Sequence, residues 1–167
     1  ERLKTVPYQF IKPYLIDPVF KNCSKELKIS YLNSNGLIHI LQDIKADINL
    51  MQSDILCVSE IKMSNTVSNE DIKIANFDIC CRLDGETNGS GGMVVYIKNS
   101  LSTSVEIVEK RRKIYRETYL EQIRLQYEGE NITFVYFHPN LAKKASDALK
   151  LITQDFADST GKIDRST

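Results

Sequence analysis

Three polar side chains stand just past apolar segments, where they could bind a cation or a phosphate. Asn33 follows a short apolar segment, Glu60 follows the apolar run 54–59, and Tyr136 closes a third segment. Carboxylate and amide oxygens suit hard cations such as Mg²⁺, and a phenol can donate a hydrogen bond to phosphate. Simpler interpretations stay open: Asn33 and Asn35 form a turn, Glu60 is a solvated strand end, and Tyr136 is a core residue.

Glu121 is a carboxylate on an otherwise apolar strand face. Period-two alternation over 118–127 places it on the same side as Tyr119 and Ile123. A buried carboxylate needs a partner or a cation. An edge position, where the tip of the side chain reaches water, explains Glu121 equally well.

The remaining candidates are basic. We interpret His138 as an exposed turn residue rather than a general base. The run 110–113, together with Arg116, lies between two expected strands. It fits a solvated hairpin tip as well as a contact to a phosphate backbone.

Composition limits the function classes. The chain has 167 residues, 42% of them hydrophobic, which suits one domain. Its 22 basic and 22 acidic residues exclude bulk polycationic binding to nucleic acid. No apolar run approaches the ~20 residues of a membrane span. The four cysteines form no CxxC pair, so we expect buried thiols in a reducing compartment.

The elements that must position these side chains follow from hydrophobic periodicity. Prolines mark residues 1–26 as an irregular extension, and 27–167 is expected to form one α/β or α+β domain. Two helices are expected, at 37–51 and from 140 through Phe156. The expected strands are 27–32, 54–59, 77–83, 93–97, 102–109, 118–127 and 131–137.

In this order, four segments resemble motifs of the endonuclease/exonuclease/phosphatase superfamily. They are the opening strand with Asn33-Ser34-Asn35-Gly36-Leu37, the segment 53–60, the glycine-led strand 91–98, and the tyrosine segment 134–140. The resemblance extends over roughly residues 27–158. The N-x-N-G-L form is similar to endonuclease domains of retrotransposons and Helitron-type elements, since repair enzymes usually carry Asp at the position of Asn35.

The resemblance implies the N-terminal half of a DNase I-like four-layer α/β sandwich that hydrolyses DNA phosphodiesters with Mg²⁺, or with Mn²⁺. Glu60 would bind the metal, supported by Asn35. Asn33 would position the scissile phosphate or the catalytic carboxylate. Tyr136 would donate to the phosphate or steady the attacking water. Glu121 matches a glutamate often found on that strand. A nuclear location also follows from the resemblance to mobile elements.

The sequence departs from this family in three places. Ile61 replaces the usual threonine, and neither the later Gly-Asp-x-Asn motif nor the C-terminal Asp-His pair is present. Asp155 is either a helix residue before that motif, with the chain ending short of it, or part of a degenerate motif. We expect the N-terminal portion of a mobile-element endonuclease, inactive alone and self-associating through an exposed sheet face. The alternative is a catalytically dead remnant that binds nucleic acid or protein.

Overall fold

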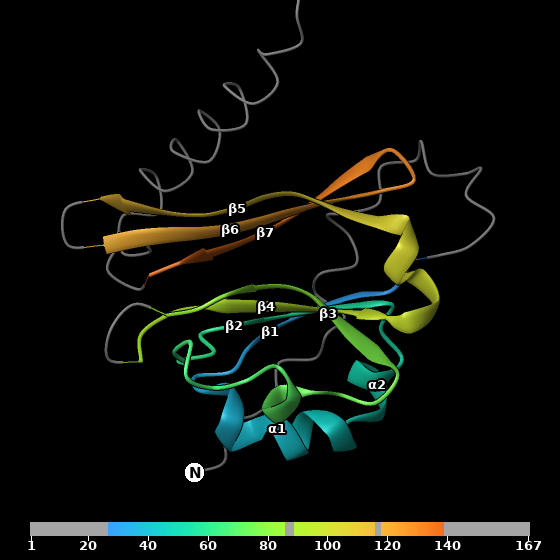
Figure 1. Ribbon diagram of the computed structural model, residues 1–167, viewed down its shortest axis with the longest axis horizontal. Coiled ribbons are helices and arrows are strands. Elements are labelled where there is room, and N and C mark those ends of the chain that lie inside the picture. The colour runs from blue at the N-terminus through green and yellow to red at the C-terminus, as the bar shows by residue number, and fades with distance from the viewer. Residues whose placement is uncertain (1–26, 86–88, 116–117, 139–167) are drawn as a thin grey trace, which may run out of the picture.

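Two β-sheets lie face to face in the computed structural model, which describes residues 27–85, 89–115 and 118–138 (Figure 1). The first sheet contains four strands in the order β1-β2-β4-β3, and the second contains three in the order β5-β6-β7. Figure 1 shows the α-helices, coloured blue to cyan, on the side of the first sheet that faces away from the second. The strands are β1 (Ile29–Asn33), β2 (Ile55–Ser59), β3 (Phe77–Leu83), β4 (Met93–Lys98), β5 (Val105–Tyr115), β6 (Thr118–Tyr127) and β7 (Glu130–Phe137).

The first sheet is the central layer of the molecule. β1 and β2 are parallel, joined through helix α1 (Leu37–Ala46), and β4 runs antiparallel to β2. Leu56 of β2 belongs to the hydrophobic cluster on the helix side, and Ile55 belongs to the cluster between the two sheets. The expectation that 54–59 forms a strand covered on both faces is therefore confirmed, because every residue of β2 is buried.

The second sheet is an antiparallel meander. β6 is its central strand, pairing with β5 on one side and β7 on the other. Ile123 and Leu125 of β6 are fully buried in the cluster between the sheets. The turn from β6 to β7 has two residues with positive φ, Glu128 and Gly129, as a tight hairpin turn requires.

The expected continuous helix 37–51 is wrong at one residue. Asp47 has an extended backbone between α1 and a short helix α2 (Ile48–Met51), and its carboxylate accepts hydrogen bonds from the amides of Asn49 and Leu50. This is the geometry of a helix N-cap, so Asp47 begins a second helix instead of continuing the first. Ile48, expected on the apolar face, is consequently 72% exposed.

The expected strand 102–109 is also wrong in its bounds. A short 3-10 helix, η4 (Asn99–Ser104), precedes β5, and β5 then continues to Tyr115 through the basic run 110–113. The residues of that run are therefore paired strand residues and not a hairpin tip. A second 3-10 turn, η3 (Glu70–Ile72), lies between β2 and β3.

The predicted α+β class is confirmed, because the described residues form two sheets and short helices. The likeness to the N-terminal half of a DNase I-like sandwich stays a prediction. The helix expected from residue 140, the extension 1–26, Cys23 and Asp155 lie outside the described residues. No helix in the described ranges is long and apolar enough to cross a membrane. The other three cysteines are free thiols, and burial raises the pKa of Cys80 to about 11.

Apolar side chains are exposed on β5, at one edge of the second sheet. Ile107, Val108 and Ile114 are each about half exposed or more. An edge strand with exposed apolar groups can pair with a second chain. The expected self-association stays a prediction, which the molecular mass in solution measured over a range of concentrations would test.

Candidate functional site

The carboxyl ends of β1 and β2 meet at one edge of the first sheet. Asn33, the last residue of β1, lies opposite Ser59, the last residue of β2. The Ser34 hydroxyl donates to the carbonyls of Ser59 and Glu60, each at 3.0 Å, and the Gly36 amide donates to the Glu60 carbonyl at 2.8 Å. These bonds hold Glu60 in the left-handed region, with φ of 50°, at the edge where sites in α/β sheets gather.

Glu60 reaches across to the second sheet. Its Oε1 accepts a hydrogen bond of 2.5 Å from the Tyr136 hydroxyl on β7. Tyr136 is only 7% exposed, and its burial and the adjacent Glu60 carboxylate raise the pKa of its phenol well above the usual value. The phenol is therefore protonated at neutral pH and acts as a hydrogen-bond donor.

Alkaline pH is expected to destabilise the fold through buried tyrosines. Burial raises the pKa of Tyr96 as well as that of Tyr136, so both phenols are harder to ionise in the folded chain. Their contribution to stability is present below about pH 10, where an exposed phenol ionises, and is lost as the pH rises from there through the raised pKa of the folded state.

The free energy of unfolding should fall above pH 10 by up to about 1.4 kcal/mol per pH unit for each buried phenol. Urea unfolding from about pH 8 to about pH 11 measures this fall. Tyr136→Phe should give a shallower fall, because one such phenol is gone. An unchanged slope in that variant would contradict the assignment.

Two carboxamides lie beside Glu60 at the end of β1. The Asn33 Oδ1 accepts from the Asn35 amide at 3.1 Å, so the Asx turn expected from the sequence is present. The Lys62 ammonium donates to the Asn35 Oδ1. Asn35 and Lys62 both have positive φ, so these two exposed residues are held by an irregular backbone on either side of the strand ends.

These residues fit a Mg²⁺ or Mn²⁺ ion only in part. Glu60 offers a carboxylate, and Mg²⁺ commonly uses one or two protein carboxylates with water and substrate phosphate. The carboxamide oxygen of Asn35 is already bound by an ammonium, which competes with a second cation. Across the described ranges, no three His, Cys, Asp or Glu residues gather as a metal centre. Glu60 thus suits a cation. Asn35, bound to the Lys62 ammonium, suits a contact to a phosphate better.

Glu121 is buried at an ion pair. Its exposure is 0%, and its Oε1 accepts from the Arg112 Nε at 2.9 Å as well as from the Arg112 Nη2. β6 is a central strand, so the interpretation of Glu121 as an edge residue is wrong and the interpretation as a partnered buried residue is correct. Both carboxylate oxygens also lie 2.9 Å from the Gly92 amide nitrogen.

Gly92 lies where a side chain cannot fit. A Cβ added there would come within 2.7 Å of the Ile61 side chain and 2.9 Å of the Gly85 nitrogen, and φ is +87°. We expect Gly92→Ala to lower the free energy of unfolding by about 2 kcal/mol or more. Gly129→Ala is the matched control, because φ is +84° there and no atom lies within 4 Å of the added Cβ. Equal losses in the two variants, measured by urea unfolding, would contradict the steric argument.

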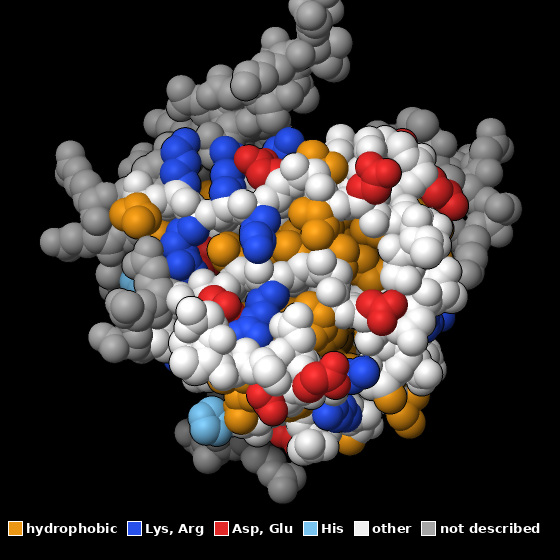
Figure 2. Space-filling view, in the orientation of Figure 1, with side chains coloured by type: hydrophobic (Ala, Val, Ile, Leu, Met, Phe, Trp, Pro, Cys, Tyr) orange, Lys and Arg blue, Asp and Glu red, His pale blue; other side chains and the backbone are white. Residues whose placement is uncertain are grey.

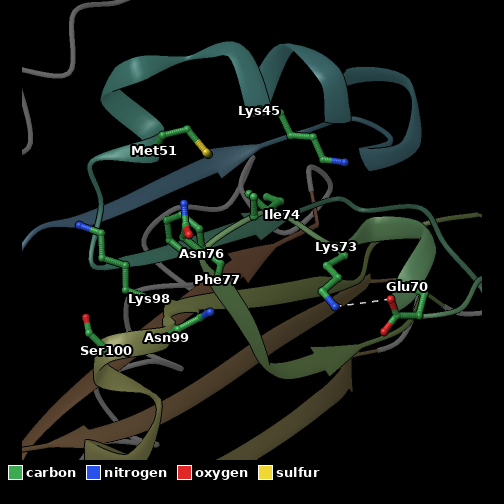
Figure 3. Close-up of a pocket in the computed structure, with 11 residues that line it drawn as sticks. Lys45, Met51, Glu70, Lys73, Ile74, Asn76, Phe77, Lys98, Asn99 and Ser100 are labelled. Atoms are coloured by element: carbon green, nitrogen blue, oxygen red, sulfur yellow. Dashed lines mark ion pairs between the residues drawn. The ribbon is translucent and has the colours of Figure 1, made fainter.

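A groove of about 1000 Å³ lies at the opposite end of the first sheet, near Lys98 at the end of β4 (Figure 3). Figure 3 shows Lys45, Lys73 and Lys98 around its apolar floor. Glu70 is the carboxylate of its lining, and it is 3.6 Å from the Lys73 ammonium. This lining suits anion binding more than hydrolysis, so we place the candidate site at Glu60.

The structure brings together most of the residues singled out from the sequence. Asn33, Asn35 and Glu60 share one sheet edge, and Tyr136 contacts Glu60. Glu121 is the cross-strand neighbour of Tyr136. The roles of these residues stay predictions, as does any role of Asp155.

Other residues were missed from the sequence. Lys62 stands two residues after Glu60, a spacing that itself signals proximity. Arg112 was considered only as part of the basic run. His138 was interpreted from the sequence as an exposed turn residue, but it is partly buried, and its ring lies 4.9 Å from the Tyr119 ring, measured between centroids.

No family model matches the sequence, and no curated protein does. Among solved structures, an AP endonuclease from Archaeoglobus fulgidus is 18% identical with a TM-score of 0.47, over 66% of this chain and 41% of that one. TDP2 of D. rerio, complexed with single-strand DNA product, is 12% identical with a TM-score of 0.47, over 78% and 54%. The inositol polyphosphate 5-phosphatase domain of SPsynaptojanin is 18% identical with a TM-score of 0.42, over 68% and 40%. The chain thus spans about half of each structure or less.

Proposed function

We propose that this chain carries the cation- and phosphate-binding part of a Mg²⁺-dependent DNA endonuclease site, of the kind found in mobile elements. The observation that carries the proposal is the hydrogen bond from the Tyr136 hydroxyl to Glu60. It joins two segments, 76 residues apart, that resemble two motifs of one nuclease family. A carboxylate and a protonated phenol, facing each other at a sheet edge, match the chemistry of phosphodiester binding.

Each residue has a chemical task in this proposal. A divalent cation would supply Lewis-acid stabilisation of charge on the phosphoryl oxygens. Glu60 would hold the cation, and Tyr136 orients the Glu60 carboxylate through its single O–H, which would have to leave Glu60 in order to donate to a phosphate oxygen. The Lys62 ammonium adds positive charge for the phosphate, and Asn33 holds the turn that carries Asn35.

Hydrolysis also needs a group that activates water. The sequence lacks the Gly-Asp-x-Asn segment that does this in the family it resembles. We therefore propose that these 167 residues bind the cation and DNA but hydrolyse DNA weakly or not at all.

A second candidate is DNA binding without cation chemistry. It is favoured by the basic residues of β5: Figure 2 shows Lys and Arg side chains gathered on the upper left of this face, where the C-terminal half of β5 runs. Lys110 and Lys113 of this strand are exposed. Such a surface attracts a phosphate backbone in a salt-dependent way.

The test compares the wild-type chain with Glu60→Gln, and with Glu130→Gln as a control, since Glu130 is exposed on the same strand as Tyr136. Mn²⁺ binding is measured by electron paramagnetic resonance, and nicking of supercoiled plasmid is measured with Mg²⁺ and with chelator. Mn²⁺ binding that is lost only in Glu60→Gln supports the proposal.

The other outcomes separate the candidates. Plasmid nicking that depends on Glu60 would support the site and overturn the expected weak activity. DNA binding without any Mn²⁺ binding would overturn the endonuclease proposal and favour the second candidate.

A further inference from the structure

The proposed cation site gives no role to the most deeply buried charge near it. The Glu121 carboxylate is 0% exposed and is paired with Arg112, whose side chain is 13% exposed. Burying two charges is costly, and a well-packed apolar pair of the same size is often at least as stable. Stability alone therefore does not account for an ion pair at this place.

The contacts of Glu121 lead to the backbone beside Glu60. The Gly92 amide donates to the Glu121 carboxylate, and the Gly92 carbonyl accepts from the Ile61 amide at 3.2 Å. The Gly91 carbonyl accepts from the Lys62 amide at 2.9 Å. The two glycines thus form a bridge, bonded to Glu121 on one side and to the two residues after Glu60 on the other.

The bridge can exist only because both residues are glycines. A Cβ on Gly91 would lie 2.5 Å from the Tyr119 hydroxyl and 2.8 Å from the Glu121 Oε1. The backbone at Gly91 therefore lies too close to β6 for a residue with a side chain. Arg112 also secures the start of the same loop, because its Nη2 donates to the Asp84 carbonyl at 2.7 Å.

A second set of contacts, through Tyr136, also connects Glu121 to Glu60. Glu121 and Tyr136 are directly opposite each other on β6 and β7, and the Tyr136 hydroxyl holds the Glu60 carboxylate. The second sheet thus holds Glu60 at two points. Tyr136 bonds to its side chain, and Glu121, through Gly92, holds the backbone of the residue that follows it. A displacement of the Tyr136 hydroxyl or of the Gly92 backbone would therefore move the Glu60 carboxylate.

We propose that Glu121, held by Arg112, is a positioning residue that fixes Glu60 and Lys62 through the bridge of Gly91 and Gly92. This inference rests on the proposed function, because that function assigns a cation to Glu60. A carboxylate is the right group for the task, because a bond from an amide N–H to a charged acceptor is shorter and stronger than one to a neutral acceptor.

Hydrogen exchange tests the bridge without any reference to activity. In Glu121→Gln, the amides of Ile61 and Lys62 should exchange about tenfold faster or more relative to the amides of the β2–β4 ladder. A residue with a merely structural role would change all these amides together. Glu109→Gln is the matched control, because Glu109 is paired with Arg111 and Arg124 on the same sheet, at 3.2 and 3.5 Å.

Loss of one charge alone can unfold the chain, so a second variant is needed. Glu121→Gln combined with Arg112→Gln removes both charges and leaves groups that can hydrogen-bond. The same local increase in exchange at Ile61 and Lys62 is expected in this double variant. Exchange at these amides that rises no more than in the β2–β4 ladder, in a folded variant, would overturn the inference.

The affinity for Mn²⁺ tests whether the bridge matters for the proposed cation site. Glu121→Gln should weaken Mn²⁺ binding about tenfold, as is typical when a group that orients a metal ligand is lost. Unchanged Mn²⁺ affinity in the folded variant would overturn the positioning role. If the wild-type chain binds no Mn²⁺, the proposed function fails, and hydrogen exchange alone then decides whether the bridge exists.

Discussion

Replacing Glu60 by glutamine is expected to weaken Mn²⁺ binding by at least about 10²-fold, equivalent to ~3 kcal/mol. The amide has nearly the same shape as the carboxylate, but it carries no charge for a hard cation. Tyr136 can still donate to the amide oxygen, so the contact between the two sheets is kept. The expected loss is therefore electrostatic and local. Titration of Mn²⁺ followed by electron paramagnetic resonance measures it.

The fold should survive this substitution, which makes the result interpretable. Glu60 is only partly buried, and its backbone is held by Ser34 and Gly36 through its carbonyl. We expect a melting temperature within a few degrees of that of the wild type. Glu60→Asp, which keeps the charge on a shorter side chain, should have intermediate affinity. Wild-type affinity in Glu60→Gln would show that any cation binds elsewhere.

The location of the site could be predicted from the sequence because it depends on strand ends. An apolar run followed by a polar residue marks where a buried strand ends, and parallel strands end at one edge. Asn33 and Glu60 were found in this way, and Asn33 pairs with Ser59, the residue before Glu60. Tyr136 required more: its contact with Glu60 joins two sheets, and no local pattern reports how sheets stack. The resemblance to a family assigned both residues to one site but predicted no contact between them, and the hydrogen bond is a finding of the structure.

The errors have a common physical cause, which is that local pattern does not reveal a competing polar contact. The apolar spacing over 37–51 is helical throughout, yet the Asp47 carboxylate caps a new helix and interrupts it. The predicted bounds of β5 were wrong for a related reason. The two interpretations of 110–113, a solvated hairpin tip or a contact to a phosphate backbone, both omitted a buried partner, although Arg112 pairs with the buried Glu121 carboxylate.

The pairing of Arg112 with Glu121 could have been predicted by counting residue pairs outward from the turn between β5 and β6. Residues 116 and 117 separate β5 from β6, and pairing outward from Tyr115 and Thr118 places Arg112 opposite Glu121. A buried acid with an opposite charge directly across the ladder is a specific signal. The bridge through Gly91 and Gly92 could not be found in this way. It depends on main-chain atoms of Gly91 and Gly92, which contact both sheets and leave no signal in a pattern of side-chain types.

Replacing Glu121 by alanine is expected to lower the free energy of unfolding by about 3–5 kcal/mol. The substitution leaves the Arg112 guanidinium without its carboxylate in a nearly buried place, and it removes the acceptor of the Gly92 amide. Domains of this size are typically stable by only ~5–15 kcal/mol, so much of the total would be lost. Urea unfolding at neutral pH measures the change.

The double-mutant cycle with Arg112→Met separates the pair from its surroundings. If the cost arises from an unpaired buried charge, Glu121→Ala combined with Arg112→Met should be more stable than Glu121→Ala alone. The bridge to Gly92 would still be missing in the double variant, so Mn²⁺ affinity should stay low while stability recovers. Recovery of both together would mean that Glu121 serves stability only. A loss below about 1 kcal/mol in Glu121→Ala would instead show that the carboxylate is not buried as the structure describes.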